Sequence, residues 1–258
     1  MVGNHDAGRS LCVLGAGNGN DLDLAALCQR YDRITLVDLD HEALKHLIES
    51  QIADSLSRQI EIVGGVDLSG ILEEQRESSP GGDLSLERWI ERARNPAKPE
   101  PLSQYSVVAS TCLLTQLIDS VAIGEVQTSS SPTETGSHGK PVSKTGLAER
   151  CLAIRDGHSR LLGELVAPGG VIVLITDFVS SDTLPELFDV DERDLGRLCS
   201  SAINGGNFFT GANPLVLAHS FKTRSGAETF EVRLAPPWRW QMGNRAFAVT
   251  AITARRNL

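Results

Sequence analysis

The chain has 258 residues, of which 41% are hydrophobic, and its formal net charge at pH 7 is −9. This length and apolar content suffice for one α/β domain over residues 1–258 that folds around its own core. The negative charge argues against broad binding to nucleic-acid backbones or anionic membranes, and no apolar run approaches the ~20 residues of a membrane-spanning helix.

The cysteines are odd in number and form no Cys-x-x-Cys pair. This usage indicates buried free thiols in a reducing compartment rather than a disulfide framework or a zinc site. Residues 1–9 are polar and lack the apolar core of a signal peptide. We therefore expect a cytoplasmic protein that binds no metal. The cysteines are Cys12, Cys28, Cys112, Cys151 and Cys199.

Apolar segments that are predicted to be strands alternate with segments of helical periodicity through the first two thirds of the chain. The predicted strands cover residues 11–14, 33–37, 60–63, 105–109 and 171–175. The predicted helices cover residues 21–30, 41–56, 71–76, 84–94 and 147–166. Such alternation predicts a parallel sheet, and the continuous apolar character of the strands suits burial on both faces.

The last third of the chain is predicted to hold a helix over 191–203 and two strands, over 214–221 and 247–254. Because no good helix separates these two strands, we expect them to form an antiparallel hairpin at a sheet edge. Upstream, residues 127–145 contain no large apolar residue except Val142, which predicts a disordered insertion.

The first predicted strand ends in a glycine-rich turn, Gly-Ala-Gly-Asn-Gly, over residues 15–19. Glycines let the chain turn tightly and let a ligand approach the backbone without Cβ clashes. Asp38 ends the second strand about 20 residues further on, where it can accept hydrogen bonds from ribose hydroxyls. Asp67 follows the third strand, where it can reach the exocyclic amine of adenine. Since ligands of open α/β sheets bind at the carboxyl ends of the strands, these groups are predicted to form one nucleoside site.

Each acidic residue of this prediction also has a structural interpretation. Asp38 or Asp40 can cap the helix that follows, and we favour Asp40 as the cap and Asp38 as the ribose ligand. Asp67 can instead cap a helix that begins at Leu68 or Ser69, and this alternative stays open.

In order and spacing, several segments together resemble the motifs of the class I methyltransferases that use S-adenosyl-L-methionine (SAM). These segments are residues 13–21, 36–40, 66–67, 107–114 and 161–175. The resemblance spans about residues 10–178. It implies a three-layer, Rossmann-like α/β fold, with a mostly parallel seven-stranded sheet and an antiparallel C-terminal strand.

The resemblance also implies that SAM is the cofactor, and it assigns contacts to individual residues. The glycine turn would pass close to the amino-acid part of SAM, and Asp38 would bind the ribose. Leu39 would pack on the adenine, Asp67 would bond its amine, and the end of the fourth strand would lie beside the methionine moiety or the substrate. The implied cofactor residues are Gly15, Ala16, Gly17, Gly19, Asp38, Leu39, Asp67, Ser110 and Thr111.

The chain carries no strong catalytic signature. Methyl transfer from a sulfonium is an in-line displacement in which positioning can dominate, although a base helps some acceptors. His158 and Asp177 flank the fifth predicted strand and are the candidate bases. For His158 we favour a solvated or satisfied structural histidine over a base, and Asp177 can equally cap a turn with Ser180 and Ser181. Residues 107–114 lack the Asn/Asp-Pro-Pro-Tyr/Phe motif of the enzymes that methylate amino groups of DNA, RNA and glutamine. We therefore expect a small-molecule acceptor and no nucleic-acid partner.

Many small-molecule methyltransferases carry N-terminal helices that form a lid over the cofactor, whereas here the first predicted strand begins about ten residues into the chain. We expect the lid to come from residues 69–104, 124–146 or 178–213, or from the second subunit of a homodimer. The segment 238–240, Trp-Arg-Trp, would suit either an aromatic and cationic wall or ordinary packing.

Two other functions stay open. One is a methyltransferase-like module that binds SAM, or no ligand, without catalysis and serves a partner. The other is an NAD(P)-dependent Rossmann oxidoreductase. Against the oxidoreductase, Asn20 stands where the third glycine of Gly-x-Gly-x-x-Gly would fall, and no Tyr-x-x-x-Lys pair is present.

Overall fold

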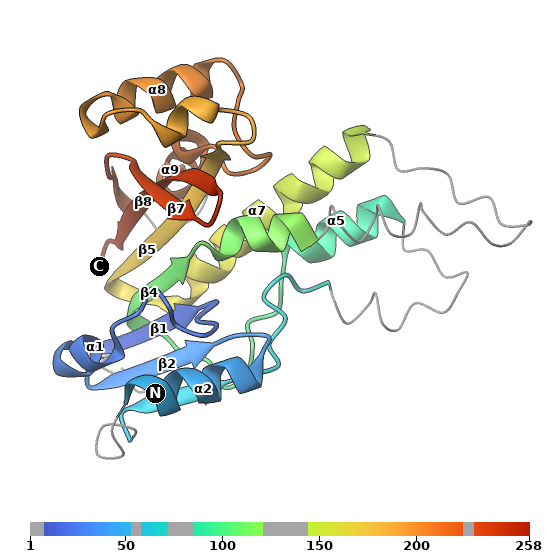
Figure 1. The fold of residues 1–258 in the computed structure, drawn as a ribbon. Coiled ribbons are helices and arrows are strands. Elements are labelled where there is room, and N and C mark those ends of the chain that lie inside the picture. Colours follow the sequence, from blue (N-terminus) through green and yellow to red (C-terminus); the bar gives the residue numbers. More distant parts are fainter. Residues whose placement is uncertain (1–7, 53–57, 72–84, 121–143, 224–229) are drawn as a thin grey trace, which may run out of the picture.

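The computed structural model describes residues 8–52, 58–71, 85–120, 144–223 and 230–258. These residues form an eight-stranded sheet in the order β3-β2-β1-β4-β5-β8-β6, in which β7 also pairs with β8 (Figure 1). The strands are β1 (Ser10–Leu14), β2 (Arg33–Val37), β3 (Ile60–Val63), β4 (Tyr105–Thr111), β5 (Val166–Ser180), β6 (Phe230–Leu234), β7 (Trp238–Met242) and β8 (Arg245–Arg256).

Helices cover both faces of this sheet and give it three layers. They are α1 (Leu24–Arg30), α2 (His41–Gln51), α5 (Leu86–Arg94), α7 (Lys144–Leu165), the short 3-10 helix η1 (Pro185–Phe188), α8 (Glu192–Asn204) and α9 (Pro214–Lys222). Side chains of α1 and α2 pack on one face, and those of α5, α7 and α9 pack on the other. Because strand side chains alternate between faces, Leu11 and Val13 of β1 join the first core while Cys12 and Leu14 join the second.

The strand directions confirm the predicted fold class. β3, β2, β1, β4 and β5 are parallel to their neighbours, whereas β8 runs antiparallel to β5, β6 and β7. The described sheet has one strand more than the seven predicted. The strand order, with an antiparallel strand between β5 and β6, is that of the Rossmann-like methyltransferase fold.

The prediction of a strand over 214–221 is wrong, because this segment forms helix α9. The Asn213 side chain caps the helix by accepting hydrogen bonds from the N–H groups of Leu215 and Val216. Pro214 occupies the first turn, where its missing N–H costs nothing. The cap and the proline decide between helix and strand in an apolar run that suits both.

The predicted hairpin therefore has a different first strand. β7 and β8 form it through a two-residue turn, since Met242 pairs with Arg245 and Gly243 has a φ of +59°. β6 was not predicted as a strand, and it pairs with the far half of β8.

The remaining differences concern the ends of elements. Helix α1 begins at Leu24 rather than at residue 21, because Asp23 accepts the N–H of Ala26 and caps it. The segment Pro168-Gly-Gly170 lies within the long strand β5, where the pairing with β4 shifts register. The predicted helix 71–76 and the predicted insertion 127–145 lie almost wholly outside the described residues, and α7 already begins at Lys144. Within the described residues, no helix combines the length and apolarity needed to cross a bilayer.

Candidate functional site

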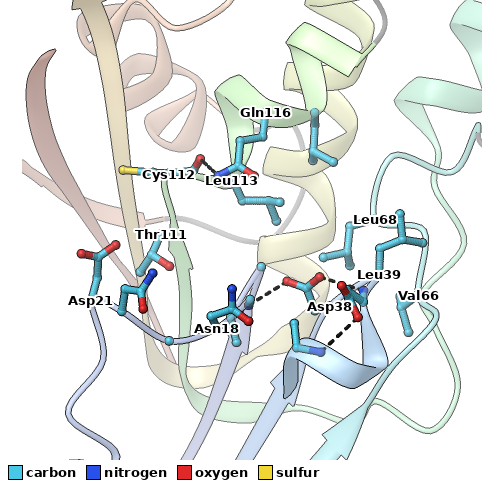
Figure 2. Close-up of a pocket in the computed structure, with 18 of the residues that line it drawn as sticks. Asn18, Asp21, Asp38, Leu39, Val66, Leu68, Thr111, Cys112, Leu113 and Gln116 are labelled. Atoms are coloured by element: carbon cyan, nitrogen blue, oxygen red, sulfur yellow. Dashed lines mark hydrogen bonds between the residues drawn. The ribbon is translucent and has the colours of Figure 1, made fainter. Parts of the chain in front are cut away.

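A cleft of about 520 Å³ opens at the carboxyl ends of the central parallel strands (Figure 2). Its walls come from the glycine turn after β1, from the segments that follow β2 and β3, from the end of β4 with the helical residues 113–120, and from β7. Its volume lies within the range of small-ligand sites. The strand ends that line it are those where open α/β sheets bind their ligands.

The glycine turn needs glycine both for its backbone and for the space around it. Gly15, Gly17 and Gly19 have φ values of +72°, +50° and +63°, a region that side chains of L-residues disfavour. A Cβ on Gly15 would lie 2.9 Å from the Cβ of Leu113, and one on Gly19 would lie 2.1 Å from a methyl of Leu47. Only glycine therefore fits at Gly15 and Gly19 without displacing a neighbouring leucine.

Asp38 is fixed against this turn by two backbone groups. Its Oδ2 accepts the N–H of Gly17 at 2.8 Å, and its Oδ1 accepts the N–H of Asp40 at 2.9 Å (Figure 2). The carboxylate is partly exposed in the cleft, and each oxygen has a further lone pair for a ligand hydroxyl. Asp40 caps α2 by accepting the N–H of Ala43, as predicted. That Asp38 binds ribose stays a prediction.

An apolar wall follows Asp38. Leu39 is 53% exposed although it is a large hydrophobic residue, and Val66 and Leu68 line the same part of the cleft (Figure 2). A flat apolar group placed against this wall would remove it from water, which is favourable by roughly 25 cal/mol per Å². The wall therefore suits a purine or another planar ring.

Asp67 lies beside this wall and closes a local turn. Its Oδ1 accepts the N–H of Ser69 at 2.8 Å and the Ser69 hydroxyl at 2.5 Å. The residues directly after Asp67, up to the end of the described segment at Ile71, are not helical. The alternative that Asp67 caps a helix there is therefore wrong, and its bond to adenine stays a prediction.

The two predicted cofactor residues at the end of β4, Ser110 and Thr111, lie in different environments. Thr111 lines the cleft, whereas Ser110 is fully buried and its hydroxyl lies 2.8 Å from Nε2 of His158. Adjacent residues of a strand point to opposite faces, so only one of the pair can reach the ligand. The expectation that Ser110 contacts the cofactor or substrate is wrong.

His158 does not line the cleft. It lies in α7 with 1% of its surface exposed, and burial lowers the pKa of its imidazole to about 4. Its Nδ1 has no hydrogen-bond partner within the described part of the chain. A neutral imidazole enclosed in this way cannot exchange a proton with a molecule in the cleft, so the structural interpretation of His158 holds.

Asp177 lies one layer behind the cleft. Its carboxylate accepts the Thr115 hydroxyl at 2.5 Å, and burial raises the pKa of the carboxyl group. It does not line the cleft, but it adjoins Cys112, which does. Burial, then the carboxylates of Asp177 and Asp21, raise the pKa of the Cys112 thiol to about 12. This thiol is therefore protonated at pH 7.

The end of β4 has one feature that the sequence did not indicate, and β7 bears out part of one alternative. Cys112 has a φ of +49°, the only positive value among the described non-glycine residues. Such strained positions concentrate at functional sites. Trp240 of β7 reaches the cleft, whereas Arg239 donates to three carbonyls around η1 and Trp238 lies outside the cleft lining. The aromatic and cationic wall considered for 238–240 thus reduces to one indole ring.

The segments that were predicted to supply a lid contribute few residues to the cleft lining. Ser69 is the one lining residue from 69–104 among those described, and 178–213, which is described throughout, supplies none. The described residues that border the far side of the cleft are instead Gln116, Leu117 and Ser120 of the helical segment, together with Trp240.

No family model and no curated protein matches the sequence. Solved structures that match it along most of its length include the methyltransferase domain of bacterial CtHen1, with 11% identity, 98% of this chain, 91% of that chain and a TM-score of 0.43. The N-methyltransferase NodS from Bradyrhizobium japonicum has 10% identity over 98% of this chain and 88% of its own, with a TM-score of 0.41. A SAM-dependent methyltransferase from Mesorhizobium loti has 13% identity over 97% and 92%, also with a TM-score of 0.41. These likenesses are distant, and the fold assignment rests on the strand order.

Proposed function

We propose that the protein is a SAM-dependent methyltransferase that acts on a small-molecule acceptor. The observation that carries this proposal is the arrangement of the cleft. A glycine turn with positive φ values, a carboxylate bonded to that turn and an exposed apolar wall follow one another at the ends of β1 and β2. The three groups match an adenosine with an attached amino-acid chain: the wall suits the adenine, the carboxylate the ribose, and the turn the amino-acid part.

Each group has a proposed role. Asp38 accepts the ribose hydroxyls with the lone pairs that the backbone leaves, Leu39 packs on the adenine, and Asp67 accepts its amine. The glycine turn, including Ala16, passes beside the amino-acid part, and Thr111 lies near the methionine chain. Bound SAM would supply an electrophilic methyl group, and the chain's part is to hold the acceptor in line with it.

The strand order weighs against a dinucleotide-dependent oxidoreductase. The dinucleotide-binding fold has the order 3-2-1-4-5-6, built from parallel mononucleotide-binding halves. Here the antiparallel strand β8 separates β5 from β6. Together with Asn20 in place of a third glycine, this favours SAM over NAD(P) as the ligand.

A module that binds SAM without transferring the methyl group is the second candidate. It is favoured by one observation: neither candidate base, His158 or Asp177, lines the cleft. In-line transfer to an acceptor that is already nucleophilic needs no base, so the enzyme remains our first proposal.

Calorimetry with S-adenosylhomocysteine and with 5′-methylthioadenosine tests the nucleoside site. Both should bind, since both carry the adenosine, and NADH should show no comparable binding. Asp38→Ala should weaken both ligands about 10- to 100-fold, because hydrogen bonds to a charged group are worth about 1.5–3 kcal/mol. The control Asp32→Ala, an exposed aspartate paired with Arg9 at the opposite end of β2, should bind like the wild type.

Asp38 also holds the glycine turn, so its removal could act through folding. Leu39→Ser avoids this problem, because the side chain is 53% exposed and its removal disturbs no core. This variant should keep its unfolding temperature and still lose affinity for both ligands. Tight NADH binding without binding of S-adenosylhomocysteine would refute the proposal.

Transfer itself is tested with SAM labelled in its methyl group and a small-molecule extract. Incorporation of label into a small molecule would support the enzyme, and binding without incorporation would support the non-catalytic module. The cytoplasmic location and the homodimer stay predictions, which cell fractionation and the mass in solution would test.

A further inference from the structure

The glycine turn divides the cleft into two halves. The first half lies at the ends of β2 and β3 and contains Asp38, Leu39 and Val66; we call it the nucleoside half. The second half lies toward β4, and Figure 2 shows Asp21, Thr111 and Cys112 on the side of the turn away from Asp38 and Leu39. We assign to this β4 half Asp21, Trp240 and the lining residues of the β4 end and the helical segment after it, which are Thr111, Cys112, Leu113, Gln116, Leu117 and Ser120.

Trp240 belongs to the β4 half because of the sheet order. β7 pairs with β8, which follows β5 and β4 in the sheet, so Trp240 comes from the edge opposite to β2 and β3. The indole packs against Phe247 with ring centroids 6.0 Å apart, and the side chain is partly exposed at the cleft. An aromatic side chain therefore borders the half that lies farthest from the apolar wall of Leu39.

The charge of the cleft is one-sided. Its charged lining residues among those described are Asp21, Asp38, Asp40 and Asp67, and none of the described lining residues is basic. In the β4 half the charged lining group is Asp21, which is exposed, while threonine, glutamine and serine side chains offer neutral hydrogen-bonding groups. A carboxylate or phosphate held here would meet a like charge without a compensating cation.

A second carboxylate, that of Asp177, adds negative charge near the β4 half although it does not line the cleft. Asp177 and Asp21 both act on the thiol of Cys112, so the two carboxylates lie close to this part of the wall. A cation that acts on Asp177 is Arg245, which also pairs with Asp182 and lies over the ring of Phe247. It does not line the cleft, and so it offers no direct contact to a ligand there.

We propose that the β4 half is the binding site for an acceptor that carries an ammonium group, with Asp21 and Trp240 as its specificity-determining residues. Asp21 attracts the cation, and the Trp240 ring offers it, or an attached aromatic ring, a favourable face. The inference rests on the proposed function, because it requires the adenosine of the cofactor to occupy the nucleoside half and its methionine chain to run along the glycine turn as far as Thr111, beside the acceptor. It concerns which acceptor is held and leaves open which of its atoms receives the methyl group.

A pair of probes with the same skeleton and opposite charge tests this proposal: phenethylamine and 3-phenylpropionate. Each is titrated into protein that is saturated with S-adenosylhomocysteine, and calorimetry and tryptophan fluorescence follow binding. Phenethylamine should bind roughly tenfold more tightly, because an exposed charge pair contributes up to about 1 kcal/mol of attraction and a like pair repels by a similar amount. The preference should shrink as salt screens the exposed charge.

Variants then assign the preference to residues. Asp21→Asn should bring the two affinities close together, and Trp240→Leu should weaken both probes through loss of the ring. Asp189→Asn is the matched control, since it removes an exposed aspartate outside the cleft, and it should leave the preference unchanged. Thermal unfolding shows that each variant is folded before it is titrated.

The outcomes separate the two proposals. Equal affinity for the two probes, or no amine binding to the loaded protein, would overturn the acceptor proposal while binding of S-adenosylhomocysteine stands. If Asp21→Asn weakens S-adenosylhomocysteine but not 5′-methylthioadenosine, which lacks the amino acid, Asp21 holds the amino group of the cofactor and the acceptor proposal is wrong. If S-adenosylhomocysteine itself fails to bind, the proposed function is refuted, and the acceptor proposal, which depends on it, is refuted as well.

Discussion

Acidification should destabilise this protein through one buried histidine. His158 is enclosed between α7 and β4, its Nε2 lies 2.8 Å from the Ser110 hydroxyl, and burial lowers its pKa from 6.5 to about 4. In the unfolded chain the same side chain takes up its proton near pH 6.5. As the pH falls from 7 toward 4, the unfolded state therefore binds a proton that the folded state refuses, and stability is lost.

The size of the effect follows from the two pKa values. About 1.5 pH units separate the unfolded pKa from pH 5, and about 1.4 kcal/mol per unit gives a loss of about 2 kcal/mol at pH 5. The loss should grow to about 3 kcal/mol near pH 4 and then level off, because the folded state also becomes protonated there. Above pH 7 the imidazole is neutral in both states and the effect vanishes.

Urea unfolding of the wild type and of His158→Gln at pH 7 and pH 5 measures this term. Glutamine can still bond Ser110 and does not titrate, so the wild type should lose about 2 kcal/mol more than the variant between these pH values. The raised pKa of the Asp177 carboxyl group acts in the opposite direction, since its folded form takes up a proton more readily, but it is common to both proteins and cancels.

His46→Gln serves as the control variant, because it removes an exposed histidine of α2 and leaves the buried His158 in place. Parallel pH profiles for the wild type and His158→Gln would refute the reasoning. They would mean that His158 is solvated, or already charged, in the folded protein.

Two further substitutions test local features of the fold. Gly19→Ala should lower the unfolding free energy by about 1–3 kcal/mol and weaken S-adenosylhomocysteine binding, because a Cβ at φ +63° would overlap a methyl of Leu47; unchanged urea unfolding would show that the leucine moves aside. Asn213→Ala should cost about 1 kcal/mol through loss of the α9 cap, which thermal unfolding measures, whereas Asn213→Asp should keep most of that stability.

The parallel half of the sheet could be predicted because each strand contains a short apolar run, and the runs of β1, β2 and β3 stop at a glycine or an aspartate. The bounds predicted for β2 and β3, residues 33–37 and 60–63, agree with the structure. The carboxyl ends of neighbouring parallel strands meet at one edge, so the sequence alone groups Gly15, Asp38 and Asp67 into one cleft, which all three line.

The antiparallel end could not be predicted as well, for reasons of context. The run 214–221 is apolar in both the helical and the extended pattern, and only the Asn213 cap followed by proline distinguishes the two. β6 is short and mostly exposed, so it carries little hydrophobic signal. The side of the strand on which Ser110 lies depends on register, and the position of Trp240 depends on how a hairpin folds over the sheet.

The placement of β8 has a consequence for how the protein is made. β6 joins the sheet through β8, which comes later in the chain. During synthesis, one edge of β5 therefore stays unpaired until residues 245–256 have left the ribosome. An unpaired edge strand can pair with another chain. A chain truncated before this point would keep a nearly complete nucleoside half, but its open sheet edge would be prone to aggregation and Trp240 would lack the strand with which β7 pairs.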